Sequence, residues 1–267
     1  MTRRFAMALT ALIAATPALA LDHTHKSWDD FLHAHVKYVQ GGNASRVDYS
    51  AVVKDHAQLK AVLADYAKVT RAEFDGWTKP EQQAYLINDY NALTIEKILQ
   101  RYPGIKSIRD FGSVFGNPWK DKFFTLFGEP AALDTIEHEI LRKPGLYDEP
   151  RVHFAVVCAS IGCPMLRNEA FTAGKLEAQY QDGMTRFLSD RTRNRYDPQS
   201  GKLEISMIFK WYGGDFEKGN KGFTSVKQAM SKFADQLADK PEDRAAVRGE
   251  KADVSFLDYD WSLNDAR

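Results

Sequence analysis

The chain has 267 residues, 44% of them hydrophobic, and its 36 basic and 36 acidic side chains give a formal net charge of zero. This composition is sufficient for a buried core and is unlike that of a disordered chain. The balanced charge also lacks the basic excess that is typical of nucleic-acid-binding proteins, so we expect no nucleic-acid partner.

The first 20 residues have the pattern of a secretory signal peptide. A pair of arginines precedes an apolar run from Phe5 to Ile13, and small residues lead up to Ala20. The run is shorter than the roughly 20 apolar residues of a membrane-spanning helix. We therefore expect cleavage after residue 20, and a mature protein of residues 21–267 that is periplasmic or secreted and not stably inserted in a membrane.

Three helices are predicted in the first half of the chain. Apolar residues recur at three- and four-residue steps from Ser27 to Val39, from Ala51 to Lys68 and from Glu81 to Arg101. The third helix is the longest and most apolar, and it carries two amides, Asn88 and Asn91. Because buried amides need hydrogen-bond partners, these side chains either tie the helix to neighbouring backbone or line a site.

The middle of the chain is predicted to contain a short hairpin and a helix with a polar face. Trp119–Phe127 alternates apolar and polar residues like a strand, and Leu133–Arg142 has helical spacing. On that helix Asp134 would lie next to Glu137 and His138, three and four residues away. One face would then combine two acids with an imidazole and the guanidinium at the end of the helix.

The stretch Arg151–Leu166 contains His153 and the only two cysteines, Cys158 and Cys163. Its first part, Arg151–Cys158, has the β-branched and aromatic content of a buried strand. Because side chains alternate along a straight strand, His153 and Cys158 would point to opposite faces. A bend or bulge near the cysteine would bring them together.

The rest of the chain alternates between helix and extended structure. A helix is predicted over Asn168–Leu188, a hairpin over Asn194–Ile205 and a helix over Ser225–Ala238, and two aromatic segments are Phe209–Phe216 and Tyr259–Trp261. No repeat or low-complexity linker interrupts the order. We therefore predict a single α+β domain with helices packed on a central, mostly antiparallel sheet.

Cys158 is the candidate nucleophile. A cysteine reacts as a thiolate, which a neighbouring histidine, cation or helix N-terminus favours. Two histidines are candidate bases, two carboxylates could orient the imidazole, and the two amides could serve as polar or oxyanion donors. The candidate catalytic residues are Cys158, His153, His138, Glu137, Asp134, Asn88 and Asn91.

Other uses of the two cysteines stay open. Their spacing permits a small disulfide loop between Cys158 and Cys163, but it is not the Cys-x-x-Cys spacing of redox enzymes. Thiol redox exchange and an inert buried thiol are further alternatives. The histidines near the N-terminus and the polar helix face match no standard zinc spacing, so we predict no metal and no cofactor.

Five motifs in order resemble the domain-of-unknown-function family 547, over roughly residues 77–264. The motifs are Asn88-x-x-Asn91-Ala-Leu-Thr-Ile, Leu133-Asp-x-Ile-Glu-His-x-Ile-Leu-Arg142, Val152-His-Phe-Ala-Val-Val-Cys-Ala-Ser-x-Gly-Cys-Pro164, Ser206-x-Ile-Phe-Lys-Trp-Tyr-Gly-x-Asp-Phe216 and Tyr259-Asp-Trp-Ser-Leu-Asn264. The long helix departs from the family in having Leu86 where a tryptophan is usual. The resemblance implies a family that is often exported, and it implies no established reaction.

More loosely, a long helix followed by a histidine-bearing strand is similar to the transglutaminase and papain-like arrangement. In that arrangement the nucleophilic cysteine begins the central helix, ahead of the histidine. Here Cys158 follows His153. The similarity therefore implies a fold and does not carry a site.

Two functions from different classes fit these residues. The first is an exported cysteine-dependent hydrolase or acyl transferase that acts on an amide or peptide bond. The second is a non-catalytic periplasmic binding domain, in which the aromatic segments wall a pocket and a Cys158–Cys163 pair staples its floor. In either case the partner is a small molecule or peptide that the sequence does not identify.

Overall fold

The computed structural model describes residues 20–112 and 117–267. The predicted signal peptide, apart from Ala20, lies outside the described residues. Among the helices described, none combines the length and the apolar character that crossing a bilayer requires.

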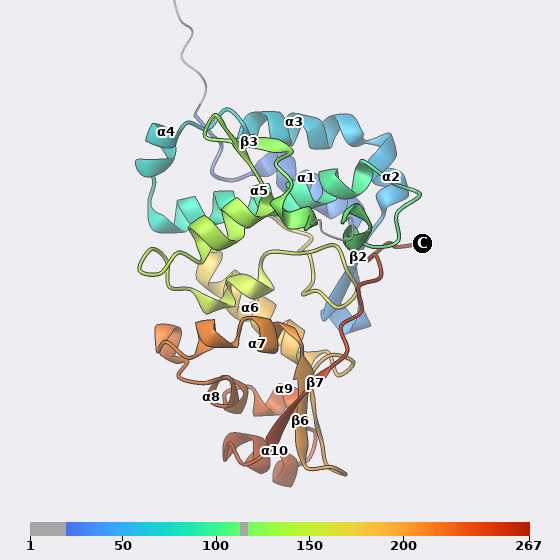
Figure 1. Cartoon of the computed structure of the whole chain (residues 1–267), viewed down its shortest axis with the longest axis vertical. Coiled ribbons are helices and arrows are strands. Elements are labelled where there is room, and N and C mark those ends of the chain that lie inside the picture. Colours follow the sequence, from blue (N-terminus) through green and yellow to red (C-terminus); the bar gives the residue numbers. More distant parts are fainter. Residues whose placement is uncertain (1–19, 113–116) are drawn as a thin grey trace, which may run out of the picture.

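The first half of the described chain is mainly helical (Figure 1). Its elements are α1 (Lys26–His35), β1 (Val36–Val39), η1 (Gln40–Gly42), β2 (Ala44–Val47), α2 (Tyr49–Lys54), α3 (His56–Tyr66), α4 (Arg71–Asp75), α5 (Lys79–Leu99), η2 (Ile108–Phe111), η3 (Pro118–Lys120), β3 (Phe124–Leu126) and β4 (Glu129–Ala131). The predicted first helix ends early, at His35, and the second is divided at Asp55.

The second half mixes short helices with strands. Its elements are η4 (Thr135–Leu141), η5 (Pro150–Phe154), α6 (Leu176–Ser189), β5 (Arg195–Asp197), β6 (Lys202–Ser206), α7 (Ile208–Trp211), η6 (Gly213–Phe216), η7 (Asn220–Gly222), α8 (Val226–Ser231), α9 (Ala234–Leu237), α10 (Pro241–Arg248) and β7 (Asp253–Leu257). The labels η mark short 3₁₀-helices, except η4, which is a π-helix.

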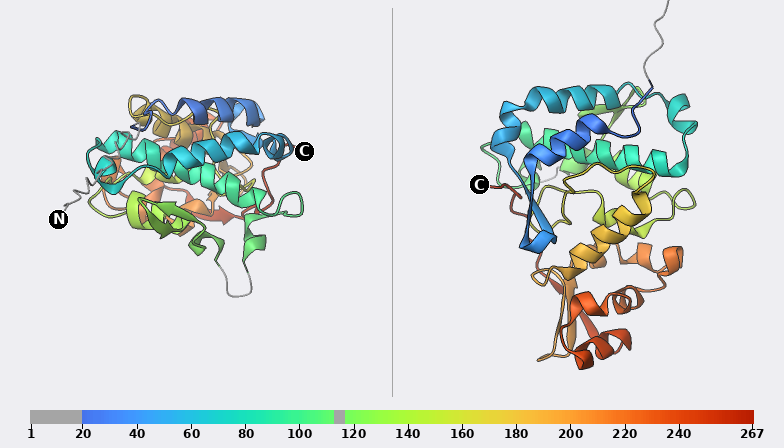
Figure 2. Two further views of the ribbon diagram at one scale, coloured as in Figure 1. Left: turned by 90° about the horizontal axis from the view of Figure 1, so that it is seen from above. Right: turned by 180° about the vertical axis from the view of Figure 1, so that it is seen from behind.

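The strands form three small sheets. β1 pairs with β2, β3 pairs with β4, and the third sheet has the order β5-β6-β7, with β6 and β7 parallel. The predicted α+β class is confirmed, and three separate small sheets replace the single central sheet that we expected. In Figure 2 the helices α1 to α5 lie together at one end of the molecule, and β5 to β7 with α8 to α10 form the other end.

Two hydrophobic clusters correspond to these two ends. The first contains Phe31, Tyr85 and Ile87 from α1 and α5, and the second contains Phe187 and Met230 from α6 and α8. The segment that leads to Cys158 crosses from one cluster to the other. Phe154 belongs to the second cluster, and Val156 and Val157 belong to the first. The cysteine loop therefore lies where the two clusters meet.

The long helix α5 explains how this crossing is held. It begins with a capping box, in which the Thr78 side chain accepts from the Glu81 N–H and the Glu81 carboxylate accepts from the Thr78 N–H. In its buried middle, Asn91 Nδ2 donates to the Ala155 carbonyl at 2.9 Å, and Asn91 Oδ1 accepts from the Val157 N–H at 3.0 Å. One side chain thus satisfies both backbone groups on the approach to Cys158.

The strand predicted over Arg151–Cys158 is wrong. Residues 150–154 form the 3₁₀-helix η5, which the Glu149 side chain caps by accepting from the Arg151 N–H, and no strand in the described part of the chain pairs with them. The β-branched residues bury their side chains without a sheet because Asn91 takes the place of a strand partner. Strand alternation therefore gives no reason to separate His153 from Cys158.

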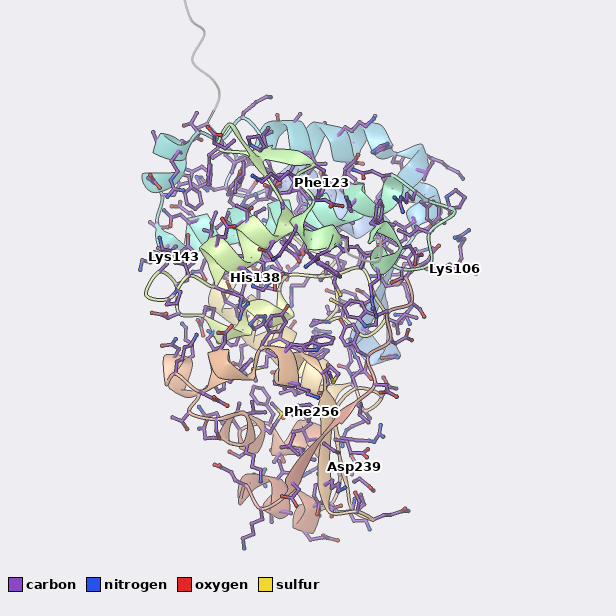
Figure 3. The ribbon with its side chains drawn as sticks, viewed as in Figure 1. Lys106, Phe123, His138, Lys143, Asp239 and Phe256 are labelled. Atoms are coloured by element: carbon purple, nitrogen blue, oxygen red, sulfur yellow. The ribbon has the colours of Figure 1, made fainter. Side chains whose placement is uncertain are left out.

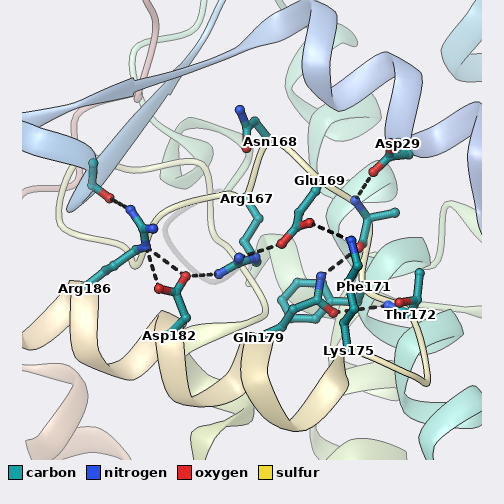
Figure 4. Close-up of polar contacts among 12 residues, drawn as sticks. Asp29, Arg167, Asn168, Glu169, Phe171, Thr172, Lys175, Gln179, Asp182 and Arg186 are labelled. Carbon is teal, nitrogen blue, oxygen red and sulfur yellow. Dashed lines mark hydrogen bonds and ion pairs between the residues drawn. The ribbon is translucent and has the colours of Figure 1, made fainter.

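The helix predicted from Asn168 begins only at Leu176, and a polar network holds the segment before it (Figure 4). Arg167 donates to both Glu169 and Asp182, and the Ala170 N–H donates to Asp29 of α1 at 2.8 Å. The chain that leaves the cysteine loop is consequently fixed to α6 on one side and to α1 on the other.

Candidate active site

A cleft of about 230 Å³ opens where the two hydrophobic clusters meet. Aromatic side chains form much of its wall, and thiol, imidazole and carboxyl groups lie among them. His138, labelled in Figure 3, lies between the helical end of the molecule and the end that carries β5 to β7. The aromatic lining residues are Tyr90, Trp119, Trp211, Tyr212, Tyr259 and Trp261.

Cys158 lies half-buried in this cleft, beside two hydroxyl groups that are also hydrogen-bonded to each other, Ser160 Oγ donating to the Tyr259 hydroxyl at 3.2 Å. Its sulfur is 3.0 Å from Ser160 Oγ and 3.2 Å from the Tyr259 hydroxyl, and both cysteines are free thiols. Burial alone would raise the pKa of the Cys158 thiol, but hydrogen bonds from Cys163, Ser160 and Tyr259 together hold that pKa below its ordinary value. The surroundings of Cys158 thus favour the thiolate.

Cys163 has the opposite character. Its sulfur accepts from the Cys158 backbone N–H at 2.9 Å, and its side chain is buried. Burial, together with the hydrogen bond to Cys158, raises the pKa of the Cys163 thiol well above its ordinary value. The pKa values of the two thiols are therefore shifted in opposite directions, and Cys158 is the one that ionises more readily.

The C-terminal segment fixes the cysteine loop and brings Tyr259 to it. The Gly162 N–H donates to the Asp260 carbonyl at 2.8 Å, and the Asn264 N–H donates to the Ala159 carbonyl at 3.0 Å. A Cβ at Gly162 would lie 3.0 Å from the backbone nitrogen and oxygen of Asp260, so a side chain there would push the two segments apart. Glycine at this position allows the Tyr259 hydroxyl to reach the sulfur.

His153 forms a second polar group in the cleft. Its Nε2 lies 2.9 Å from Asp215 Oδ2, and its ring stacks on Tyr212 with 3.9 Å between ring centroids. Burial lowers the pKa of His153, although the hydrogen bond to Asp215 partly offsets the effect. A carboxylate can only accept, so the neutral ring carries its proton on Nε2 and leaves Nδ1 as the basic nitrogen.

Asp215 is held by three cationic or polar donors. Besides His153, it accepts from Arg142 Nε at 2.7 Å and from Lys218 Nζ at 3.0 Å. Burial alone would raise the pKa of Asp215, but these donors lower it far below its ordinary value. Asp215 is therefore a permanent carboxylate that orients the His153 ring.

The predicted polar face of acids, imidazole and guanidinium exists, but on a π-helix. The Arg142 N–H bonds to the Glu137 carbonyl at 3.0 Å, a five-residue step. Arg142 donates to His138 Nδ1, whose Nε2 lies 3.7 Å from Asp134. Glu137 accepts from the Tyr90 hydroxyl at 2.8 Å. Asp134, Glu137 and His138 all line the cleft.

The two amides of α5 lie elsewhere. Asn88 exchanges two hydrogen bonds with the Phe171 backbone, and Asn91 holds the approach to Cys158. Neither is among the described residues that line the cleft. The structure thus brings together five of the seven candidate residues, namely Cys158, His153, His138, Glu137 and Asp134.

Three residues outside the candidate catalytic set also belong to this cleft or its support, and two of them, Asp215 and Tyr259, lie in the aromatic segments that we expected to wall a pocket. Asp215, Ser160 and Tyr259 contact either the imidazole or the sulfur directly. All three lie inside the sequence motifs that begin at Val152, Ser206 and Tyr259. These motifs could therefore have identified the three residues as candidates for the site. Among the described residues no group of three or more His, Cys, Asp or Glu side chains has the arrangement of a metal site.

The family model that matches is DUF547, a protein of unknown function, and it covers residues 74–188. The matched stretch is similar to this family. It includes α5, η4 and the whole cysteine loop, and the resemblance drawn from the motifs is thereby confirmed for this part of the chain. Asp215 and Tyr259 come from beyond the DUF547 match, so the cleft is completed by later residues. No curated protein and no solved structure matches the chain.

Proposed function

We propose that the protein is a cysteine-dependent acyl transferase or hydrolase that acts on an amide or peptide bond, with Cys158 as the nucleophile. The observation that supports this most is the pair of hydroxyl groups, of Ser160 and Tyr259, within 3.2 Å of the Cys158 sulfur, in a cleft that is also lined by His153, the partner of Asp215. Donors that stabilise a thiolate make it available at neutral pH without a base in contact with it.

The proposed roles differ from those of a directly paired cysteine and histidine. In the described residues the hydrogen bonds of the Cys158 sulfur run to hydroxyl and thiol groups, and none of them involves an imidazole. The thiolate would attack the substrate carbonyl, the C–N bond would break, and the amine would leave with a proton taken from water, which gives a thioester. His153 Nδ1 would then accept the proton of the incoming water or amine, and the thiolate would be released.

His138 is the second candidate for proton transfer. It lines the same cleft, and its Nδ1 accepts from Arg142, so a neutral ring carries its proton on Nε2. That nitrogen faces Asp134 and Glu137 at 3.7 and 3.9 Å. A neutral His138 is thus suited to donate a hydrogen bond through Nε2 and donates a proton only from its protonated form, whereas His153 is suited to accept a proton at Nδ1.

The test is the formation of a covalent intermediate. The purified protein is incubated with acyl thioesters and activated esters that differ in their acyl group. The reaction is quenched in acid, and the mass of the peptide that contains Cys158 is measured by mass spectrometry. We expect an acyl adduct on Cys158 in the native protein and in Cys163→Ser, and none in Cys158→Ser. Hydrolysis that persists unchanged in Cys158→Ser would reject the proposal.

A binding domain remains the second candidate, and the aromatic wall of the cleft favours it. Trp211, Tyr259 and Trp261 pack together with ring centroids 4.6 to 5.7 Å apart, and Trp211 is 43% exposed although it is large and apolar. Exposed aromatic clusters at a cleft mouth often contact ligands. Under this alternative, ligands that quench tryptophan fluorescence would bind equally to the native protein and to Cys158→Ser, without turnover in either.

We also propose that the protein is exported and cut after Ala20. The support is the charged and apolar pattern of the first 20 residues. Sequencing the N-terminus of the protein purified from its host would give Leu21 as the first residue. A mature protein that retains Phe5 would contradict this.

A further inference from the structure

The two cysteines both line the cleft, but they differ in exposure and in hydrogen bonding. Cys158 lines the cleft, is half-buried and is surrounded by donors. Cys163 is 7% exposed, and its sulfur already lies 2.9 Å from the backbone nitrogen of Cys158. Within one cysteine the backbone nitrogen and the sulfur are joined through only two carbon atoms. The Cys163 sulfur thus lies against the backbone of Cys158, and side-chain rotation is the movement that would bring the two sulfurs together.

From this geometry we infer that Cys158 and Cys163 form a reversible oxidation site for hydroperoxides, in which Cys158 is oxidised first and Cys163 then closes a disulfide. The inference rests on the proposed function in one respect, namely that Cys158 is a reactive thiolate. It goes beyond the proposed function because it assigns a second substrate class and a means of switching the cleft off.

The two steps balance without a further partner. The Cys158 thiolate attacks one oxygen of the hydroperoxide, the O–O bond breaks, and with one proton the products are a sulfenic acid and an alcohol, or water from hydrogen peroxide. The Cys163 thiol then attacks the sulfenic sulfur, an S–S bond forms, the S–OH bond breaks, and water leaves with the thiol proton. Two electrons pass from the two sulfurs to the peroxide.

The fixed loop holds the Cys163 thiol close to Cys158 for the second step. Both ends of the loop are bonded to the C-terminal segment, through Gly162 to Asp260 and through Ala159 to Asn264. The Cys163 carbonyl also accepts from the buried Arg193 guanidinium. Because the backbone already holds the two side chains together, the disulfide requires little rearrangement. A sulfenic acid at Cys158 would be captured before a second peroxide could reach it.

The disulfide would remove the nucleophile from the cleft. An enzyme with a sulfur–sulfur bond at Cys158 has no thiolate to attack a carbonyl, and a dithiol would restore it. Peroxide would therefore inhibit turnover reversibly.

The experiment uses the full-length mature protein, first reduced and then exposed to equimolar hydrogen peroxide with dimedone present. Trypsin releases residues 152–167 as one peptide that contains both cysteines, because no lysine or arginine stands between Arg151 and Arg167. We expect the native peptide to lose two hydrogens and to gain no dimedone. In Cys163→Ser we expect a dimedone adduct on Cys158, and in Cys158→Ser we expect neither product.

A second measurement guards against a variant that does not fold. The rate of thiol loss in the native protein is compared with that of a synthetic peptide of residues 152–167, and we expect the native protein to react on the order of tenfold faster. Equal rates, or native protein in which both thiols survive peroxide, would overturn the inference. Acyl-adduct formation without disulfide formation rejects this inference alone, and a disulfide without any acyl adduct rejects only the proposed acyl transfer.

Discussion

The cleft around Cys158 and the hollow between α3 and α5 both bury ionisable groups in apolar surroundings. The hollow has a volume of about 310 Å³, with Phe123 and Phe124 in its wall, and Asp89 of α5 lines it with 4% of its surface exposed. No described residue donates a hydrogen bond to the Asp89 carboxylate, and burial raises the pKa of this group to about 8. In the cleft, by contrast, donors lower the pKa of Cys158 and of Asp215 in spite of burial.

The difference shows what separates a candidate reactive site from a merely buried acid. Desolvation acts on all three groups and disfavours their charged forms. Only in the cleft do neighbouring side chains compensate, through the hydroxyls at the thiol and the cations at Asp215. Donors that converge on a nucleophile, rather than burial, are therefore the feature on which the proposed function depends.

The largest expected effect comes from removing the carboxylate that orients His153. Asp215→Asn should lower turnover on the order of 10³-fold, because the amide can stabilise the wrong tautomer of the ring. Lys218→Ala is the matched control, since it removes only an exposed partner of the same carboxylate. Steady-state kinetics, on the substrate identified by the acyl-adduct test, compares the turnover of the two variants. Equal losses of turnover would mean that Asp215 contributes only its negative charge and does not orient the ring.

In the hollow between α3 and α5 we expect the opposite effect, because replacing the carboxyl group of Asp89 should stabilise the fold. The folded protein keeps the Asp89 proton up to a pKa of about 8, whereas the unfolded chain releases it near the ordinary value of 3.8. Stability is therefore lost as pH rises from about 4 to about 8, at up to about 1.4 kcal/mol for each pH unit. Asp89→Asn should abolish this loss, and its free energy of unfolding at pH 8 should exceed that of the native protein.

Urea unfolding at pH 5 and pH 8 measures the two free energies of unfolding. Glu96→Gln is the control on the same helix, because Glu96 is paired with His56 at 2.6 Å rather than unpaired. If Asp89→Asn and the native protein lose stability in parallel between the two pH values, Asp89 does not carry the proton that we assign to it.

The two amides of α5 provide a matched pair within the core. Asn91→Ala leaves the Ala155 carbonyl and the Val157 N–H without partners, and Asn88→Ala does the same to the Phe171 backbone. Each should cost about 1–3 kcal/mol of unfolding free energy. Only Asn91→Ala should also slow the alkylation of Cys158, because only Asn91 holds the approach to the cysteine. Equal alkylation rates in both variants would contradict this.

The smallest expected effect is the loss of one donor to the thiolate. Tyr259→Phe keeps the ring packing and removes the hydroxyl that lies 3.2 Å from the Cys158 sulfur. The remaining donors, Ser160 and Cys163, should keep the thiol pKa within roughly one unit of its native value. A pH titration of Cys158 alkylation detects the shift, which must be upward if the hydroxyl stabilises the thiolate.

Local features of the fold could be predicted, and features that depend on distant partners could not. The helix expected over Glu81–Arg101 is α5, because its N-cap, proline and apolar stripe are all encoded within its own residues. The hairpin expected over Asn194–Ile205 is β5 and β6. The strand expected over Arg151–Cys158 is absent because Asn91, more than 60 residues earlier, satisfies its backbone.

The same reason limits what could be predicted of the cleft. Cys158 and His153 could be predicted as candidate site residues because they lie close together in the sequence. Their actual partners, Tyr259 and Asp215, are 101 and 62 residues away. Spacing alone cannot bring such residues together, although both stand in motifs that the family resemblance had marked.

The most direct test of the account is the pH dependence of Cys158 alkylation by iodoacetamide in the native protein, followed on the peptide of residues 152–167. Cys163→Ser serves as the reference in which Cys158 is the only cysteine. We predict that the rate of alkylation reaches half of its maximum at a pH below the ordinary cysteine pKa of about 8.5. A half-maximal rate at or above that value would show that burial prevails over the donors, and the proposed nucleophile would be contradicted.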